Sequence, residues 1–153
     1  FGCDSLTSVT LPDSLTAIDG YAFSYCSSLA AVTLPDSLTA IGDSAFYLCD
    51  SLSSIILPNS VTTIGNCAFS WCDSLTTLSL PSNLITIDDC AFYGCSSLIS
   101  VTLPDSLTAI GGMAFSGCDN ATFTVGRESC AKQYCVDNDL PYTYADADDW
   151  LNG

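Results

Sequence analysis

One pattern recurs through most of this 153-residue chain at a fixed interval of 23 residues. The interval is marked by a cysteine, a proline and an Ala-Phe pair. The cysteines are Cys3, Cys26, Cys49, Cys72, Cys95 and Cys118; the prolines are Pro12, Pro35, Pro58, Pro81 and Pro104; and the pairs begin at Ala22, Ala45, Ala68, Ala91 and Ala114. Units of this length stack as a solenoid, because a single unit cannot bury its apolar face alone.

Each unit predicts a strand, a turn, a second extended arm and a short helix. In the first unit, alternation places Val9 and Leu11 on one face of a strand, and Pro12 ends that strand because it has no N–H to donate. The Ala-Phe pair and the following cysteine would share one face of a helix of about two turns. Stacked strands would pair in parallel as one curved sheet, about 4.8 Å apart.

Small or acidic residues stand immediately before each predicted helix. They are Asp19-Gly20, Gly42-Asp43, Gly65-Asn66, Asp88-Asp89 and Gly111-Gly112. Gly, Asn and Asp tolerate positive φ angles, and Asp and Asn can cap a helix start. We therefore expect these pairs to adopt positive φ angles or to cap the helices.

The motif L-x2-[VIL]-x-L-P-x-S-L resembles the strand signature of leucine-rich repeats. The full unit, with its Leu-Pro and Ala-Phe-x2-Cys marks, resembles the BspA-like class of bacterial leucine-rich repeats over about residues 1–144. The resemblance implies an α/β solenoid: a right-handed superhelix with a parallel β-sheet, short helices on the convex side and a C-terminal cap. One departure is that the usual Asn-ladder position holds Ser14, Ser37, Ser60 and Ser106, with Asn only at Asn83. A Ser hydroxyl can still bond neighbouring backbone, more weakly.

The pattern divides the chain into three parts. Residues 1–118 are expected to form a solenoid of about five units, 119–144 a capping segment of the same domain, and 145–153 a loose acidic tail. In the cap, Phe123 and Val125 replace the strand pair, residues 127–138 predict a longer helix and residues 140–144 a final edge strand.

Charge and composition exclude several partners and chemistries. The chain has seventeen acidic residues and only two basic ones, Arg127 and Lys132, which gives a net charge of −15. Such a surface repels phosphate, so neither nucleic acid nor an anionic membrane is an expected partner. No apolar run approaches the roughly 20 residues of a membrane span, so no membrane insertion is expected. The chain contains no His, the commonest general base. We therefore expect neither an enzyme nor a cofactor.

The spacing of the ten cysteines predicts neither a disulfide framework nor a zinc site. The six-membered column beside Phe predicts buried, reduced thiols, because Cys packs there as a small hydrophobe. Cys67 and Cys90 share a second column and would face each other across adjacent units, so a disulfide between them stays open. Cys130 and Cys135, five residues apart on the predicted cap helix, have poor bridging geometry. The acidic run 146–149 lacks the spacing of a calcium loop.

Two surfaces are candidates for ligand binding. The outward positions of the concave sheet carry small, uncharged side chains: Ser8, Thr10, Thr33, Ser54, Ile56, Thr77, Ser79, Ser100 and Thr102. Simple β-propensity on a solvated sheet would explain the same residues. Aromatic side chains recur near the Ala-Phe marks at Tyr25, Tyr47, Trp71 and Tyr93. Exposed rings favour protein or sugar contact, although rings also shield seams between packed elements.

The resemblance to BspA-like surface proteins implies a function as well as a fold. It implies a non-catalytic recognition or adhesion module that binds a protein or glycan, at the cell surface or outside the cell. A passive spacer within a longer cell-surface protein is the alternative. The chain opens inside a repeat, so we expect a longer parent protein, and no signal peptide is seen in this stretch. The uncovered first unit, residues 1–25, predicts end-to-end dimerisation or fraying.

Overall fold

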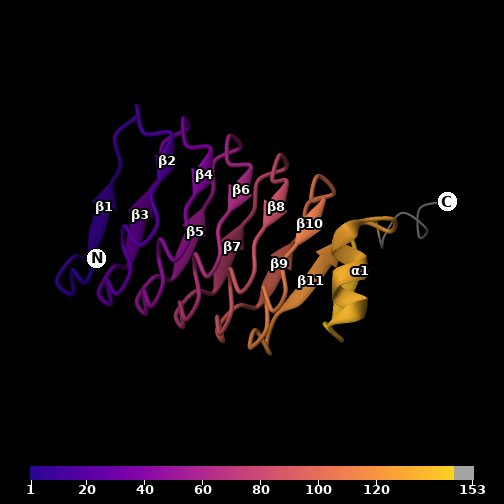
Figure 1. The fold of residues 1–153 in the computed structure, drawn as a ribbon. Coiled ribbons are helices and arrows are strands. Elements are labelled where there is room, and N and C mark those ends of the chain that lie inside the picture. Colours follow the sequence, from indigo (N-terminus) through magenta and orange to yellow (C-terminus); the bar gives the residue numbers. More distant parts are fainter. Residues whose placement is uncertain (147–153) are drawn as a thin grey trace.

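The computed structural model describes residues 1–146, in which the repeats stack as turns of a parallel β-solenoid (Figure 1). Most turns contribute one longer and one shorter strand. The longer strands are β1 (Ser8–Thr10), β3 (Ala31–Thr33), β5 (Ser54–Ile56), β7 (Thr77–Ser79), β9 (Ser100–Thr102) and β11 (Thr122–Val125). The shorter strands are β2 (Ala17–Ile18), β4 (Ala40–Ile41), β6 (Thr63–Ile64), β8 (Thr86–Ile87) and β10 (Ala109–Ile110). The predicted solenoid is confirmed.

The strands pair in parallel, and within the repeats the partners are one period apart. Val9 pairs with Val32, and Ile18 with Ile41. The shorter strands form a sheet of their own, in the order β10-β8-β6-β4-β2. The longer strands do not form the single sheet that we expected, because they divide into β1-β3 and β12-β11-β9-β7-β5. The ladder bonds that join the other neighbouring long strands are not formed between β3 and β5, and the sheet is interrupted there.

The predicted short helices on the convex side are wrong. Over residues 1–146 the one α-helix is α1 (Cys130–Asp137), and the Ala-Phe segments are successive turns. Tyr21 and Tyr25 both have a φ of 60°, which a right-handed helix does not accept. We call these segments the turn ladder: residues 19–26, 42–49, 65–72, 88–95 and 111–118.

Hydrogen bonding explains why the turn ladder replaces a helix. The N–H of Ala22 donates to a carbonyl three residues back, at Asp19 (3.3 Å). The N–H of the next residue, Phe23, donates instead to Ala45 in the following turn of the solenoid (2.8 Å). This alternation continues along the first four segments, each of which has a further segment of the ladder beside it. A helix would consume every N–H internally, whereas the turn ladder leaves alternate N–H groups to join successive turns of the solenoid.

The glycines that precede the Ala-Phe pairs serve close approach, not positive φ. A Cβ on Gly42 would lie 2.7 Å from the backbone nitrogen of Gly20 and 2.8 Å from the carbonyl oxygen of Ile18. The positive φ angles fall later, at Tyr21, Ser44 and their equivalents. The expected role of these glycines is therefore corrected: Gly42 allows one turn of the solenoid to lie close against the backbone of the previous turn.

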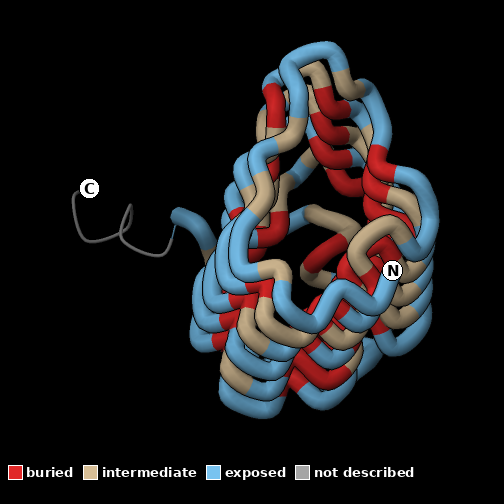
Figure 2. Tube along the Cα trace, turned by 90° about the vertical axis from the view of Figure 1, so that its left-hand side faces the viewer, coloured by how far each residue is buried: buried red, intermediate tan, exposed pale blue. Residues whose placement is uncertain are grey.

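A column of stacked phenylalanines forms the centre of the core. Phe46, Phe69, Phe92 and Phe115 are fully buried. Consecutive rings in this column have centroids 5.1–5.2 Å apart and planes within 6° of parallel. Figure 2 shows buried positions recurring at the same places in successive turns. The ring spacing is close to the spacing of paired strands, so the stacking follows directly from the register.

Serine hydroxyls join the turns at the position that corresponds to the Asn ladder of the leucine-rich repeat pattern. The Oγ of Ser37 donates to the carbonyl of Leu15 at 2.6 Å, and the Oγ of Ser106 donates to Leu84 at the same distance. Asn83 makes the related bond to Asn59 at 3.1 Å. Ser therefore bonds neighbouring backbone here, as the sequence predicts.

The C-terminal segment covers the last turn of the solenoid (Figure 1). Helix α1 begins after Ser129, whose Oγ accepts the N–H of Lys132 at 3.0 Å, and β12 (Tyr142–Tyr144) pairs with β11. Asp146, near the start of the expected acidic tail, forms an ion pair with Arg127 at 2.8 Å. The remaining positions of the run weighed as a calcium loop, 147–149, lie outside the described residues.

Candidate functional site

The nine predicted sheet positions all lie on an exposed face. The face, which we call the sheet face, consists of the outward side chains of β1, β3, β5, β7 and β9: Ser8, Thr10, Thr33, Ser54, Ile56, Thr77, Ser79, Ser100 and Thr102. The side chains between them point inward, and Ile55, Leu78 and Val101 are buried. The predicted alternation is therefore present. Whether the sheet face binds a ligand stays a prediction.

A hollow of about 320 Å³ lies on the sheet face between β3 and β5. Thr33, Ser54 and Ile56 line it together with Ala31, Leu34 and Pro58, and Asp36 is its one carboxylate. Ile56 is 74% exposed, which is unusual for a large apolar side chain in a strand. The hollow coincides with the interruption between the two sheets. It offers hydroxyl groups, an apolar contact and a single acid to a ligand.

The four predicted aromatic residues form two separate pairs. Tyr25 meets Tyr47 edge-on with centroids 5.5 Å apart, and Trp71 meets Tyr93 in the same way at 5.3 Å. Tyr25 and Trp71 are 44% and 40% exposed. Trp71 also packs flat on the chain, since a Cβ on Gly94 would lie 2.7 Å from the indole. The rings therefore shield a seam between turns and also present surface to solvent.

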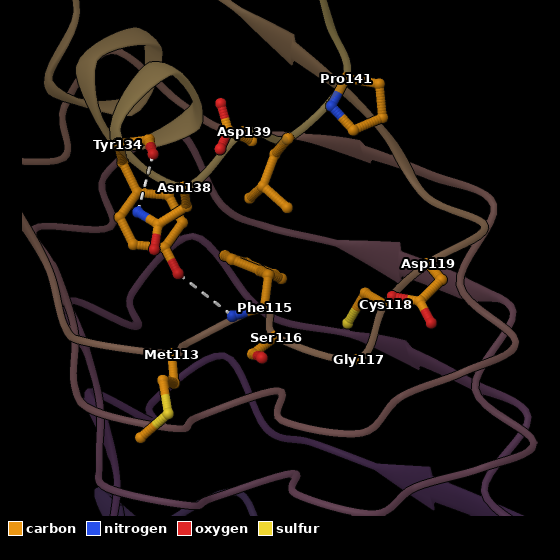
Figure 3. A pocket seen from close by; sticks show the side chains of 11 residues that line it. Met113, Phe115, Ser116, Gly117, Cys118, Asp119, Tyr134, Asn138, Asp139 and Pro141 are labelled. Atoms are coloured by element: carbon orange, nitrogen blue, oxygen red, sulfur yellow. Dashed lines mark hydrogen bonds between the residues drawn. The ribbon is translucent and has the colours of Figure 1, made fainter.

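A second hollow, of about 360 Å³, lies where the cap meets the solenoid (Figure 3). The hydroxyl of Tyr134 reaches from α1 and accepts the N–H of Phe115 at 3.3 Å. The neighbouring ladder donors, the N–H groups of Met113 and Gly117, have no partner among residues 1–146. Asp119 and Asp139 line the same hollow. Sequence reasoning missed this site, because it exists only where α1 folds back on the last turn.

A further hollow, of about 350 Å³, is lined by Asp43, Asp88 and Asp89. Asp43 accepts the N–H of Asn66 at 2.9 Å, and Asp89 accepts the N–H of Gly112 at 2.7 Å. These carboxylates thus join successive turns and do not cap helices as we expected. Burial raises the pKa of Asp88, and the nearby charges of Asp43 and Asp89 add to the effect. Over the described range, no cluster of three or more His, Cys, Asp or Glu side chains is arranged to hold a metal ion.

The cysteines fall into a buried column and a set of more accessible thiols, and all ten are free. Cys26, Cys49, Cys72, Cys95 and Cys118 are buried, as predicted, whereas Cys3 is exposed and departs from the expectation. Each later thiol of the column donates to a carbonyl of an earlier turn, as Cys95 does to Phe69 at 3.1 Å. Burial raises the pKa of Cys49 and Cys118 to about 12. These buried thiols are therefore poor nucleophiles.

The cap cysteines differ from each other in accessibility. Cys135 is buried, and burial raises its pKa to about 11, whereas Cys130 is partly exposed. Cys67 and Cys90, which sit in the turn ladder, are also partly exposed. Separately, none of the helices among residues 1–146 has the length and apolar character that a membrane crossing needs.

Three solved structures resemble this chain in sequence and fold. A leucine-rich repeat protein of T. pallidum is 34% identical, with a TM-score of 0.75 over 78% of this chain and 58% of that one. A leucine-rich cell surface protein of Faecalibacterium prausnitzii is 32% identical, with a TM-score of 0.61 over 80% of this chain and 40% of that one. A leucine-rich repeat protein of Bacteroides ovatus is 25% identical, with a TM-score of 0.54 over 94% of this chain and 55% of that one.

This chain thus spans between 40% and 58% of the length of those three structures. No curated protein matches it. Residues 1–122 match the BspA type leucine rich repeat region in six copies, one more than the roughly five units counted from the sequence. With the 23-residue register and the parallel solenoid already described, this match places the chain in the BspA-type leucine-rich repeat family.

Proposed function

We propose that this chain is a non-catalytic recognition module that binds a protein or glycan through the sheet face. The hollow at Thr33, Ser54 and Ile56 carries the proposal, because it lies within a long row of exposed, uncharged side chains. A similar structure is that of a leucine-rich cell surface protein, which supports a position at the cell surface. In this proposal the repeats are the scaffold, and their exposed side chains would contact the ligand.

The physical properties of the sheet face suit a binding role. The strands are fixed by ladder hydrogen bonds and by the buried core beneath them, so a ligand would not have to order the backbone on binding. Ile56 would contribute apolar area and the neighbouring hydroxyls would contribute hydrogen bonds. The net charge of −15 favours neutral or basic ligands over anionic ones.

The test uses panels of immobilised glycans and secreted proteins, followed by titration of any binder. Replacing Ser54 and Thr77 by Arg should weaken binding at least about tenfold, because two long charged side chains would cover the sheet face. The matched control replaces Ala17 and Ala109 by Arg, since both lie exposed on the other sheet. Equal affinity in both double variants, with unchanged urea midpoints, would contradict a site on the sheet face.

The aromatic pairs are a second candidate surface. The Tyr25–Tyr47 and Trp71–Tyr93 pairs repeat the same arrangement two turns apart, which corresponds to about 10 Å along the stack. Such a repeat suits an extended ligand with a regular period, as in a glycan. Trp71→Ala should then abolish binding, whereas Tyr21→Ala, another exposed ring, should not. A chain that binds nothing on either panel would favour the spacer alternative.

A further inference from the structure

The turn ladder brings two partly exposed thiols side by side. Cys67 and Cys90 occupy equivalent positions in adjacent turns, with φ angles of 53° and 56°. The N–H of Cys67 donates to the carbonyl of Asp89 at 3.0 Å, which fixes the two segments in register. In-register parallel neighbours lie about 4.8 Å apart, and disulfides span Cα separations of about 4.4–6.8 Å. The backbone therefore already has the spacing that a disulfide requires.

Both side chains are partly exposed, so a small reagent can reach either thiol. Burial raises the pKa of Cys90, and the neighbouring thiol of Cys67 and the charge of Asp89 raise it further.

The remaining eight cysteines lack this combination of adjacent position and access. The stacked thiols of the core column are buried, and those of Cys49, Cys72, Cys95 and Cys118 are held by backbone carbonyls. Cys3 is exposed but stacks below the buried Cys26, and Cys130 shares α1 with the buried Cys135. Cys67 and Cys90 are thus the adjacent pair, among the ten cysteines, in which both thiols reach solvent.

We propose that Cys67 and Cys90 form a disulfide between adjacent turns of the solenoid when a low-molecular-weight disulfide is present. One cysteine loses its proton, and the thiolate attacks the reagent disulfide; a protein–reagent mixed disulfide forms and one reagent thiolate leaves. The second cysteine then loses its proton and attacks the protein-side sulfur, which releases the other reagent thiolate. The protein dithiol is oxidised by two electrons, the reagent disulfide is reduced to two thiols, and both protons pass to the released thiolates.

The bridge would close one complete repeat into a covalent loop. It would lie beside the hollow formed by Asp88 and Asp89, in the same two turns that carry the Trp71–Tyr93 pair. The cross-link would therefore restrain the separation of these two turns. Buried thiols elsewhere in the core would be left unchanged, because the reagent does not reach them.

The experiment exposes the whole chain to oxidised glutathione, blocks free thiols by alkylation, and maps the digested protein by mass spectrometry. We expect a Cys67–Cys90 cross-linked peptide, with glutathione attached at the exposed Cys3 as the internal sign that the reagent was active. In Cys67→Ser, glutathione should instead remain attached to Cys90, since no second thiol displaces it. In the double variant Ser44→Cys, Cys90→Ser the pair moves one turn, and a cross-link should form at the new position.

The proposal is overturned by a wild-type map in which Cys3 carries glutathione while Cys67 and Cys90 stay reduced. Separate glutathione adducts on Cys67 and Cys90, with no cross-link, overturn it as well. Both of these outcomes are measured on the wild-type chain, so they do not depend on whether a variant folds. Reduction of the cross-linked protein with dithiothreitol should restore both thiols.

Discussion

Phe69 shows how one repeated residue connects the period of the sequence to the stability of the fold. Its side chain is fully buried, and its ring stacks on Phe46 and Phe92 at 5.1 and 5.2 Å. Its N–H donates to Ala91 in the next turn at 2.7 Å. Because the same residue recurs in register, each ring supports its neighbours on both sides. A change in this column therefore affects more than one turn of the solenoid.

Phe69→Ala should lower the free energy of unfolding by about 3–5 kcal/mol, since it removes a fully buried ring and leaves a cavity. The matched control is Thr77→Ala on the sheet face, which should change stability by no more than about 0.5 kcal/mol. Urea unfolding followed by circular dichroism measures both. Similar losses in the two variants would mean that the inward and outward faces have been assigned the wrong way round.

Helix α1 is predicted by its local sequence and also has a tertiary role. Ser129 caps its first turn, and Tyr134 on its buried side reaches the last turn of the solenoid. The backbone N–H of Phe115 therefore donates to the Tyr134 hydroxyl. In the earlier turns, the equivalent N–H donates to a backbone carbonyl of the next turn. The cap thus ends the stack by replacing part of the missing hydrogen bonding as well as by covering apolar surface.

Ser129→Ala should lower stability by about 1 kcal/mol, because the first-turn N–H of Lys132 loses its acceptor. Hydrogen exchange should also become faster at the amides of α1 and at Phe115, while exchange at Ile55 in the middle of the solenoid stays slow. Ser116→Ala, an exposed serine in the turn ladder, is the control and should leave both quantities unchanged. A loss of protection throughout the chain would show that α1 is not a separable cap.

Negative charge dominates the behaviour of the whole molecule. The chain has a net charge of −15, and the hollow beside Asp43 brings several carboxylates together. Burial raises the pKa of Asp50 and Asp88, and neighbouring aspartates raise both further. The Arg127–Asp146 pair acts in the other direction, because the arginine holds the pKa of Asp146 below its usual value. Because two carboxyl pKa values are raised and one is lowered, we expect the folded state to bind protons more tightly than the unfolded state.

Acidification from neutral pH through the folded-state pKa of Asp88 should therefore raise the urea midpoint. A carboxyl whose folded pKa is raised above the unfolded value of 3.8 binds protons more tightly when folded. Its destabilising effect is present above the folded pKa and is relieved as the pH falls through it. Asp88→Asn should reduce the pH response, whereas Asp13→Asn, at an exposed site, is the control. Falling stability over this range would contradict the prediction.

The first turn of this chain is less covered than the middle turns. Leu6, Val9, Leu11 and Leu15 are partly exposed, whereas their equivalents two turns later, Leu52, Ile55, Leu57 and Val61, are buried. An apolar layer next to an edge strand can pair with another chain or can fray. We propose that residues 1–25 either pair with a second copy of the 153-residue chain or fray.

Hydrogen exchange should accordingly be faster at Val9 than at Ile55 in dilute solution. Light scattering should show dimers as the concentration rises, and a capping repeat added before Phe1 should restore a monomer and raise the melting temperature. A monomer at high concentration together with equal exchange at Val9 and Ile55 would be incompatible with both behaviours.

The 23-residue period by itself determined the register, the core columns and the exposed face. Once residues one period apart stack, Phe46 must meet Phe69, and alternation must place Ser54 opposite Ile55. The period also identified the aromatic positions and the neighbouring column of Cys67 and Cys90. It did not determine how the four rings pair or how far each thiol is exposed, because those depend on the backbone angles of the turns.

Only the tertiary structure decided the conformation of the Ala-Phe segments, and the reason is hydrogen bonding between turns. Local spacing favoured a helix, but alternate N–H groups such as that of Phe23 bond the next turn of the solenoid. The hollow between β3 and β5 lies where the sheet is interrupted, and the hollow at the cap lies where Tyr134 meets Phe115. Each depends on contacts between segments distant in the chain, which a repeated local pattern does not encode.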